Sequence, residues 1–278
     1  MKARMRVCAS NKAMILITGA TDGIGLETAR QLAVQGQALV LHGRTEDKAQ
    51  RARNELLRSA PQATLLTVHA DLADLAAVAR MADELNDRLD VLDVLINNAG
   101  VYLTERRLSK DGFEMTMAVN HLAHFLLTLR LLPLLKKSAD PRVVTVSSMV
   151  HSSGRLSFDN GDNQERYDGY HAYANSKLAC SLFARELARR EPWLASNSLH
   201  PGVIGTKLLH AAFNMQGSST SEGARTSVYL ATASECKGIS GKYFDNCRIA
   251  AAAAKVNDPQ LAELLWQWSE NTLKLKNN

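Results

Sequence analysis

Residues 14–35 read MILITGATDGIGLETARQLAVQ, and this stretch decides the fold. Its first four residues form a short apolar run, which is typical of a buried strand. A turn follows that contains Gly19, Gly23 and Gly25, and the apolar residues after it recur at helical spacing. Strand, glycine turn and helix in this order present backbone N–H groups and a helix N-terminus to a pyrophosphate. The stretch therefore predicts an α/β protein that binds phosphate.

The glycine spacing is G-x-x-x-G-x-G, whereas the commoner dinucleotide fingerprint is G-x-G-x-x-G. Spacing alone leaves an ordinary glycine-rich loop open as an alternative. The position of the turn, between a strand and a helix, favours phosphate binding.

Composition limits the class of protein. A length of 278 residues suits one large α/β domain, and 46% apolar with 22% charged residues describes a soluble globular chain. The net charge of +5 is small and spread along the sequence, which argues against a nucleic-acid-binding surface. The 4 cysteines form no C-x-x-C pair, so neither a zinc site nor a disulfide framework is indicated. This cysteine usage fits a reducing, cytoplasmic location.

The chain is expected to form one domain. Residues 1–13 are polar and basic and lack the apolar core of a signal peptide, so they are predicted to be a disordered extension. Residues 14–278 then form a dinucleotide-binding catalytic domain. No run reaches the roughly 18 apolar residues that a membrane span needs.

The end of the second predicted strand, residues 37–41, is informative about the nucleotide. In a dinucleotide fold this strand end meets the adenosine ribose, and an acidic residue there selects NAD. Positions 42–45 hold no acid, and Arg44 stands among them. A solvated arginine is the alternative, but the position favours contact of Arg44 with a 2′-phosphate. After the next strand, Asp71 could accept from the adenine amine, or Asp71 or Asp74 could cap a helix.

A further strand at residues 91–96 ends in Asn97-Asn98-Ala99-Gly100. These residues could form a simple turn. Alternatively, the asparagine amides could lock neighbouring strands together while Gly100 lets the backbone approach a cofactor.

A long helix is predicted at residues 113–135, and Asn120 lies inside it. Asparagine is a poor helix-interior residue because its side chain competes for backbone partners, so Asn120 is expected to have a specific role. His121 and His124 have no metal-type partners nearby and are expected to be packing residues.

Ser148, Tyr173 and Lys177 form the candidate catalytic group. Ser148 follows a strand at residues 142–146, at the ligand-facing edge of an open parallel sheet. Tyr173 and Lys177 are four residues apart on a predicted helix at residues 170–190, so they share one face. An ammonium beside a phenol favours the phenolate, which makes the phenol a usable acid and base. An exposed pair arising by chance is the alternative, but the full set of motifs in this order argues against it.

With these motifs, residues 14–244 resemble the short-chain dehydrogenase/reductase family. Phe158-Asp159, Tyr167 and residues 172–179 (AYANSKLA) are most similar to its retinol-dehydrogenase and protochlorophyllide-reductase branch. The resemblance implies a single-domain Rossmann-type fold, doubly wound, with a mostly parallel seven-stranded sheet and helices on both faces. It also implies hydride transfer between a nicotinamide cofactor and a carbonyl/alcohol substrate. The alternatives are reduction of an activated C=C bond and a weakly catalytic redox sensor or scaffold.

The same resemblance implies roles for individual residues. Ser148 positions a carbonyl, Tyr173 exchanges the proton, Lys177 holds the nicotinamide ribose and Asn120 supports a proton-relay water. The cofactor is NADP, with NAD as the alternative, and no metal is expected. The implied cofactor contacts are Gly19, Thr21, Asp22, Gly23, Ile24, Gly25, Arg44, Asp71, Leu72, Asn98, Ala99, Gly100, Tyr173, Lys177, Pro201, Gly202, Val203 and Thr206. Asp22 departs from the basic residue that several NADP-using members carry before the second glycine.

The expected partner is a small molecule, an apolar alcohol or carbonyl compound, and neither nucleic acid nor a membrane span is expected. Residues 207–221 are expected to form a lid over the site. A terminal helix at residues 259–273 carries Trp266 and Trp268, which pack either in the core or at a subunit contact. A homodimer through the helices at residues 113–135 and 170–190 is expected, although the loop at residues 152–168 could block it.

Overall fold

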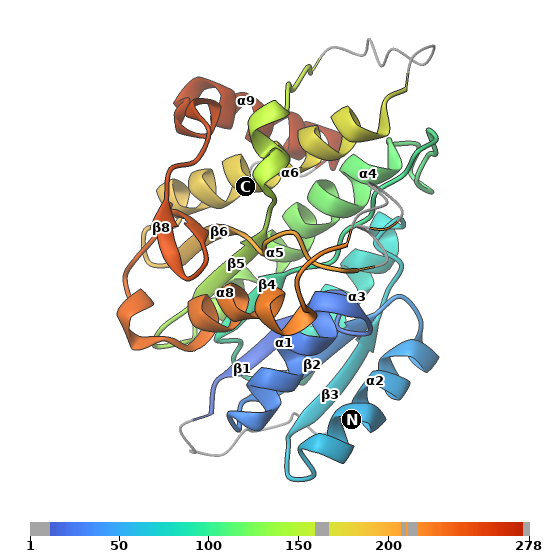
Figure 1. Cartoon of the computed structure of the whole chain (residues 1–278), viewed down its shortest axis with the longest axis vertical. Coiled ribbons are helices and arrows are strands. Elements are labelled where there is room, and N and C mark those ends of the chain that lie inside the picture. Colours follow the sequence, from blue (N-terminus) through green and yellow to red (C-terminus); the bar gives the residue numbers. More distant parts are fainter. Residues whose placement is uncertain (1–11, 159–166, 207–209, 211–215, 275–278) are drawn as a thin grey trace.

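The computed structural model describes residues 12–158, 167–206, 210 and 216–274. Its centre is an 8-stranded sheet with the order β3-β2-β1-β4-β5-β6-β7-β8. Neighbouring strands are parallel, except that β7 and β8 are antiparallel. The strands, drawn in Figure 1, are β1 (Met14–Ile17), β2 (Ala38–Gly43), β3 (Leu65–His69), β4 (Val94–Asn97), β5 (Arg142–Val146), β6 (Ala195–His200), β7 (Tyr243–Asp245) and β8 (Arg248–Ala250).

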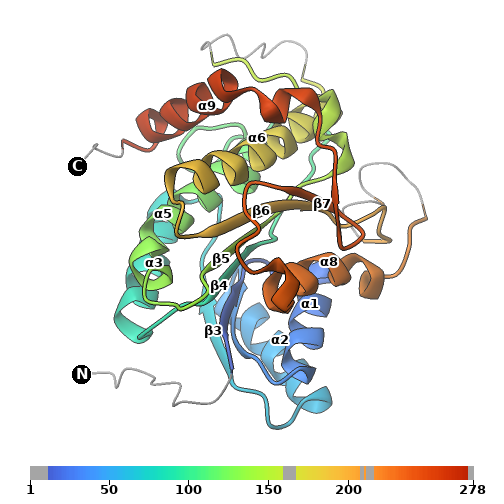
Figure 2. The same ribbon diagram turned by 90° about the vertical axis from the view of Figure 1, so that its left-hand side faces the viewer.

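Helices cover both faces of the sheet. Figure 2 shows α1, α2 and α8 on one face and α3, α5 and α6 on the other, with α9 lying outside α6. The α-helices are α1 (Gly23–Val34), α2 (Glu46–Ser59), α3 (Leu75–Arg88), α4 (Met115–Met117), α5 (Ala123–Leu135), α6 (Gly169–Arg190), α8 (Thr220–Thr232) and α9 (Pro259–Thr272). Short 3₁₀ turns occur at Met149–Ser153, Ser234–Cys236 and Ala254–Asn257.

The alternation of side chains along each strand explains the two helical layers. Leu16 and Leu95 belong to the apolar cluster that includes α3 and α5. Their neighbours Ile15 and Ile96 belong to the cluster that includes α1 and α8. Because successive side chains of a strand point to opposite faces, the apolar strands are buried on both sides, as parallel sheets require.

The strand order places a ligand site at one edge of the sheet. From β1 the chain continues to β2 and β3 on one side, and then returns to β4 on the other side of β1. The chain therefore turns in opposite directions along the sheet after β1 and after β4, which leaves a crevice between the two loops. In open α/β sheets, ligands bind outside the carboxyl ends of the strands at such a switch point.

The sheet has one strand more than the seven expected. The additional strand, β8, follows β7 through a tight turn in which Asn246 and Cys247 adopt left-handed φ angles of 46° and 60°. A strand of 3 residues is too short to show a periodic pattern, and the turn lacks the glycine that usually marks this conformation.

The predicted helix at residues 113–135 is not a single α-helix. It consists of α4, a wide π-helical turn at Ala118–Leu122, and α5. The N–H of Ala123 bonds to the carbonyl of Ala118, five residues earlier. Such wide turns are frequent at functional sites, and this one contains Asn120.

The terminal helix α9 packs against α6 and places Trp266 in the core. The Trp266 ring lies 4.8 Å from Phe125 of α5 and 6.0 Å from Phe183 of α6, measured between centroids. Trp268 instead contacts Phe158, at 6.0 Å. Thus α9 covers apolar side chains of the two helices that the sequence offered for pairing, and the homodimer stays a prediction.

One segment, Met115–Leu135, is long and apolar enough to cross a membrane by length and composition, but 78% of its most apolar window is buried. Core packing therefore accounts for its apolar character, and the cytoplasmic location stays a prediction. The expectations for residues 1–11 and for most of the lid, at residues 207–209 and 211–215, lie outside the described residues.

Candidate active site

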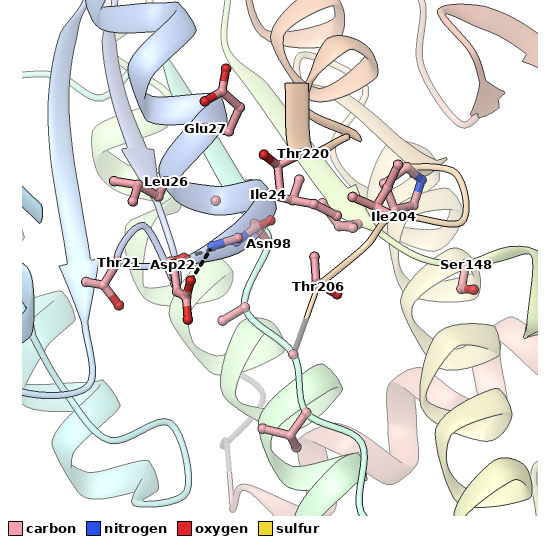
Figure 3. A pocket seen from close by; sticks show the side chains of 18 of the residues that line it. Thr21, Asp22, Ile24, Leu26, Glu27, Asn98, Ser148, Ile204, Thr206 and Thr220 are labelled. Atoms are coloured by element: carbon pink, nitrogen blue, oxygen red, sulfur yellow. Dashed lines mark hydrogen bonds between the residues drawn. The ribbon is translucent and has the colours of Figure 1, made fainter. Parts of the chain in front are cut away.

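A cavity of about 1040 Å³ opens at the switch point of the sheet. Its volume is at the upper end of the range usual for small-molecule sites. Every residue that the sequence placed in the site lines it, with the exception of Asn120. Figure 3 shows Thr21 and Asp22 at one end, Ser148 at the other and Thr206 between them.

The glycine turn between β1 and α1 is shaped to receive a phosphate group. Gly19 and Gly23 have left-handed φ angles of 67° and 55°, which favour glycine. Asp22 caps α1 and accepts a hydrogen bond from the Gly23 N–H at 2.9 Å. A Cβ added at Gly25 would lie 2.2 Å from the Gly19 carbonyl oxygen, so nothing larger than glycine fits. The residues present therefore fit the pyrophosphate of a dinucleotide.

Gly25→Ala is expected to weaken nucleotide binding by at least tenfold. The new methyl group would also lie 2.4 Å from Nδ2 of Asn98, so the turn must open to admit it. Titration of protein fluorescence with NADPH measures the loss. Gly36→Ala is a control for backbone strain away from the site, because its φ of 80° disfavours alanine, although an added Cβ there meets nothing within 4 Å and Gly36 does not line the cavity. Equal affinities for Gly25→Ala and the wild type would mean that the turn does not hold the nucleotide.

Asn98 locks the end of β4 to the end of β1. Its Nδ2 donates to the carbonyl oxygens of Thr18 at 2.8 Å and Gly19 at 3.4 Å, and Figure 3 shows this amide directed at the glycine turn. The backbone N–H groups of Asn98 and Ala99 donate to the Thr18 hydroxyl. Of the two uses suggested for the asparagine segment, the structure bears out the locking of neighbouring strands.

The end of the cavity next to β2 and α2 carries two exposed cations, Arg44 and Lys48. Neither side chain forms an ion pair with any residue that the structure describes. Arg30 also lines this end, but its guanidinium already bonds to Glu27 and Glu55. Sequence analysis did not identify Lys48. Its position four residues after Arg44, at the start of α2, is the pattern that could have identified it.

Packing explains the glycine at position 43, and hydrogen bonds show which of Asp71 and Asp74 caps the helix. A Cβ at Gly43 would lie 2.8 Å from the Thr21 methyl carbon, so close packing requires glycine there whatever the nucleotide. Asp74 is the residue that caps α3, accepting from the Ala77 N–H. Asp71 lines the cavity and accepts from the Ala73 N–H at 2.9 Å.

His42, which the sequence did not suggest, supports the glycine turn from behind. The N–H of Gly19 donates to Nδ1 of His42 at 3.1 Å, and Nε2 lies 3.0 Å from the Ala70 carbonyl oxygen. The proton therefore sits on Nε2, which donates to Ala70. Burial in this position lowers the pKa of His42 to about 4, so the ring is neutral at physiological pH.

Tyr173 and Lys177 lie at the opposite end of the cavity, one turn apart on α6. Both are buried, with 8% and 3% of their surface exposed. Nζ of Lys177 is 5.5 Å from the centre of the Tyr173 ring and donates to the Val146 carbonyl at 2.8 Å. This bond fixes the ammonium beside the end of β5, where Ser148 begins the next turn. The phenol, the ammonium and the serine thus share one end of the cavity.

The mouth near Ser148 is apolar. Met149 and Val203 both line the cavity, with 56% and 40% of their surface exposed. His200, also in the lining, accepts a hydrogen bond from the Met149 N–H at 3.3 Å. An apolar substrate would cover these two side chains and remove their surface from water.

Asn120 lies behind the cavity wall. Its amide accepts from the Val101 N–H at 2.8 Å and donates to the Val101 carbonyl at 3.0 Å and to Ser176 Oγ at 2.9 Å. A Cβ added at Gly100 would lie 3.4 Å from Oδ1 of Asn120 and 3.6 Å from Nζ of Lys177. Asn120 therefore holds the segment after Gly100 against α6, close to the lysine.

Comparison with known proteins decides the family, since residues 13–217 match the model of the short chain dehydrogenase family. The chain belongs to the short-chain dehydrogenase family. Retinol dehydrogenase 14 of Homo sapiens is 38% identical over 284 residues, covering 92% of this chain and 84% of that protein. Retinol dehydrogenase 12 of Mus musculus is 37% identical over 278 residues, covering 95% and 88%.

Solved structures agree with this assignment to the short-chain dehydrogenases. An uncharacterized protein from Mycobacterium paratuberculosis superposes with a TM-score of 0.79 at 33% identity, covering 94% of this chain and 93% of that one. A short chain dehydrogenase from Escherichia coli, complexed with NADPH, gives 0.70 at 27% identity, covering 86% and 98%. This short-chain dehydrogenase is accordingly an NAD(P)-dependent oxidoreductase that acts on an alcohol or carbonyl group.

Proposed function

We propose that this enzyme prefers NADP(H) and interconverts an apolar alcohol and its carbonyl compound. The observation that carries the proposal is the placement of the buried pair Tyr173 and Lys177 with Ser148 at one end of a cavity. Its other end holds the glycine turn and two cations. One site thus combines an acid/base group with a nucleotide cradle.

The residues divide the chemistry between them. In the direction of reduction, the Tyr173 phenol gives its proton to the substrate oxygen, and the Ser148 hydroxyl donates a hydrogen bond to the same oxygen. The Lys177 ammonium favours the phenolate that results, and Asn120 supports the water that returns the proton. A nicotinamide cofactor held in this cavity would supply or accept the hydride.

Two observations support an apolar substrate. Met149 and Val203 give the mouth of the cavity an apolar surface. The relatives with 36–39% identity are named retinol dehydrogenases 11 to 14. Retinal and retinol are therefore the first substrates to try, followed by other apolar aldehydes and ketones.

The test follows NADPH oxidation across retinal, apolar ketones, small polar aldehydes and enones, with product identification. Apolar aldehydes or ketones should be reduced at the C=O bond with a higher kcat/KM than small polar ones. Reduction of enones only at the C=C bond would overturn the carbonyl assignment. NADPH binding without turnover of any carbonyl compound would indicate a sensor or scaffold.

Cofactor preference is expected to depend on Arg44. A guanidinium can bind a phosphate with two parallel hydrogen bonds, and each charge-assisted bond contributes roughly 1.5–3 kcal/mol, or about one to two decades in affinity. Arg44→Ala should therefore lower kcat/KM for NADPH by about tenfold or more and leave that for NADH nearly unchanged. Lys48→Ala should act in the same direction, with a smaller effect.

Arg58→Ala is the control for this comparison, since Arg58 is an exposed arginine at the far end of α2 and does not line the cavity. A wild type that prefers NADH would contradict the cofactor proposal. A full NADPH preference retained by Arg44→Ala would show that another residue recognises the 2′-phosphate.

A further inference from the structure

His124 lies in the first turn of α5 and bridges the glycine turn and the π-helical turn that contains Asn120. Its Nε2 lies 2.9 Å from the Thr18 hydroxyl, and its Nδ1 lies 3.0 Å from the Asn120 carbonyl oxygen. The side chain is 2% exposed. Thr18 and Asn120 are 102 residues apart in the sequence, and His124 joins them through one ring.

The directions of these hydrogen bonds are fixed by their partners. A carbonyl oxygen only accepts, so the proton of the neutral ring must lie on Nδ1 and be donated to Asn120. Nε2 then has a free lone pair and accepts the proton of the Thr18 hydroxyl at 2.9 Å, while the other acceptor within reach of that hydroxyl, the Ile96 carbonyl oxygen, is farther away at 3.3 Å. The Thr18 oxygen in turn accepts from the N–H groups of Asn98 and Ala99, at 2.9 and 3.0 Å.

Each end of this chain of hydrogen bonds belongs to a different part of the site. Thr18 is the last residue before Gly19, and its carbonyl oxygen is held by the Asn98 amide at 2.8 Å. At the other end, the Asn120 carbonyl also accepts from Sγ of Cys180, at 3.2 Å, on the helix that carries Lys177. The imidazole therefore connects the nucleotide cradle with the wall behind the lysine.

We propose that His124 is a positioning residue with two separable functions, holding the start of the glycine turn through Thr18 and the Asn120 carbonyl through Nδ1. The Thr18 bond contributes to nucleotide affinity. The Asn120 bond contributes to turnover, and only this second function rests on the carbonyl reductase activity proposed above.

Asparagine can separate the two functions. Its amide N–H would stand near the place of Nδ1 and could donate to the carbonyl four residues earlier, as Asn86 does to Ala82 in α3 at 3.0 Å. It is too short to reach Thr18. His124→Asn should therefore keep the Asn120 bond and lose the Thr18 bond, whereas His124→Leu loses both.

His121 offers a matched control three residues away in the sequence. It is also buried, at 1% exposed, but its Nε2 bonds to Ser269 of α9 at 2.8 Å, and it does not line the cavity. His121→Leu removes a buried imidazole of the same helix without touching the turn or the Asn120 carbonyl. It reports what loss of packing alone does to the site.

The experiment measures the NADPH dissociation constant by fluorescence titration, kcat with the best carbonyl substrate, and thermal stability for each variant. His124→Leu should raise the dissociation constant about tenfold, because the buried Thr18 hydroxyl loses its shorter hydrogen bond and turns to the Ile96 carbonyl, which no longer fixes the start of the glycine turn. The same variant should lower kcat by about 10²-fold. His124→Asn should show the raised dissociation constant with kcat near that of the wild type. His121→Leu should lose stability while both other quantities stay within about threefold.

Unchanged affinity and kcat in His124→Leu would overturn the proposal. So would effects in His121→Leu equal to those in His124→Leu, since packing would then explain both. If His124→Leu does not fold, His124→Asn decides, and a parallel loss or a parallel retention of affinity and kcat contradicts two separable functions. Without any carbonyl turnover in the wild type, the proposed function fails, while the titration still tests the Thr18 bond.

Discussion

Tyr173→Phe is expected to lower kcat by at least 10²-fold and to change the NADPH dissociation constant by less than about threefold. General acid/base groups contribute typically 10²–10⁴-fold, and the substitution removes the only atom of Tyr173 that can transfer a proton. The ring keeps its packing, including the edge-on contact with Tyr102 at 5.6 Å. In the proposed assignment, the glycine turn and Lys177 hold the nucleotide, and the substitution leaves both in place.

Tyr170→Phe is the matched control for this variant. Tyr170 lies one turn earlier on α6, donates its hydroxyl hydrogen bond to Ser153 at 3.1 Å, and does not line the cavity. Its loss should leave kcat close to that of the wild type. Steady-state kinetics with NADPH, together with binding titrations, give both quantities. A decrease below tenfold in Tyr173→Phe would remove this residue from the acid/base role. Lys177→Ala should lower both affinity and rate.

Stability is expected to fall steeply as the pH decreases from about 6.5 towards 4. Burial lowers the pKa of His42 to about 4 and of His121 and His124 to about 3. An unfolded histidine titrates near 6.5, so between these limits the unfolded chain binds protons that the folded chain does not. The stabilisation from neutral burial is complete above pH 6.5 and is lost as the pH falls. Burial lowers the pKa of His151 and His200 in the same direction.

The magnitude follows from linkage. Uptake of three protons on unfolding corresponds to about 4 kcal/mol per pH unit at 25 °C. Two aspartates act in a different range. Lys110 holds the pKa of Asp74 below its ordinary value, and the backbone N–H of His171 does so for Asp168, so their contributions are lost only below about pH 4. Hydrogen bonds also lower the pKa values of Glu235 and Glu263 from an ordinary value of 4.5, so their contributions begin to be lost near pH 5. The range from pH 5 to 6 therefore reports mainly the histidines.

Denaturant unfolding at half-unit steps from pH 7.5 to 4.5 measures the slope. His121→Leu should reduce it by about 1.4 kcal/mol per pH unit, because the proton that His121 takes up on unfolding is removed while the other buried histidines remain. A wild-type slope that corresponds to the uptake of one proton or less on unfolding would contradict the prediction. A slope unaffected by His121→Leu would mean that His121 titrates alike in the folded and unfolded chain.

The parts of the site that were predictable are those whose logic is local. The glycine turn lies within one strand–turn–helix unit, and Tyr173 and Lys177 meet because they are one helical turn apart. The strands β1, β2, β4 and β5 are apolar runs that end at polar or glycine residues, and parallel strands bring these ends to one edge. The residues named from such patterns therefore came together around one cavity.

The parts that escaped prediction depend on partners distant in the sequence. His124 reads as a packing residue until the fold brings Thr18 within 2.9 Å of it. His42 was passed over because its partners, Gly19 and Ala70, come from two other loops. The glycine at position 43 is required by the Thr21 methyl, a contact between two loops that the sequence does not show. In each case the sequence gives the residue type but not the neighbour.

The position of α9 has a consequence for how the chain is made. Phe125 and Phe183 leave the ribosome well before Trp266, the residue that covers them. At typical elongation rates of about 5–20 residues per second, synthesis of α9 follows that of α5 and α6 by on the order of ten seconds. Until then, the aromatic side chains of α5 and α6 lack the helix that covers them. A nascent chain in that interval exposes the kind of surface that chaperones bind. Newly made protein should therefore aggregate most readily when translation pauses between α6 and α9.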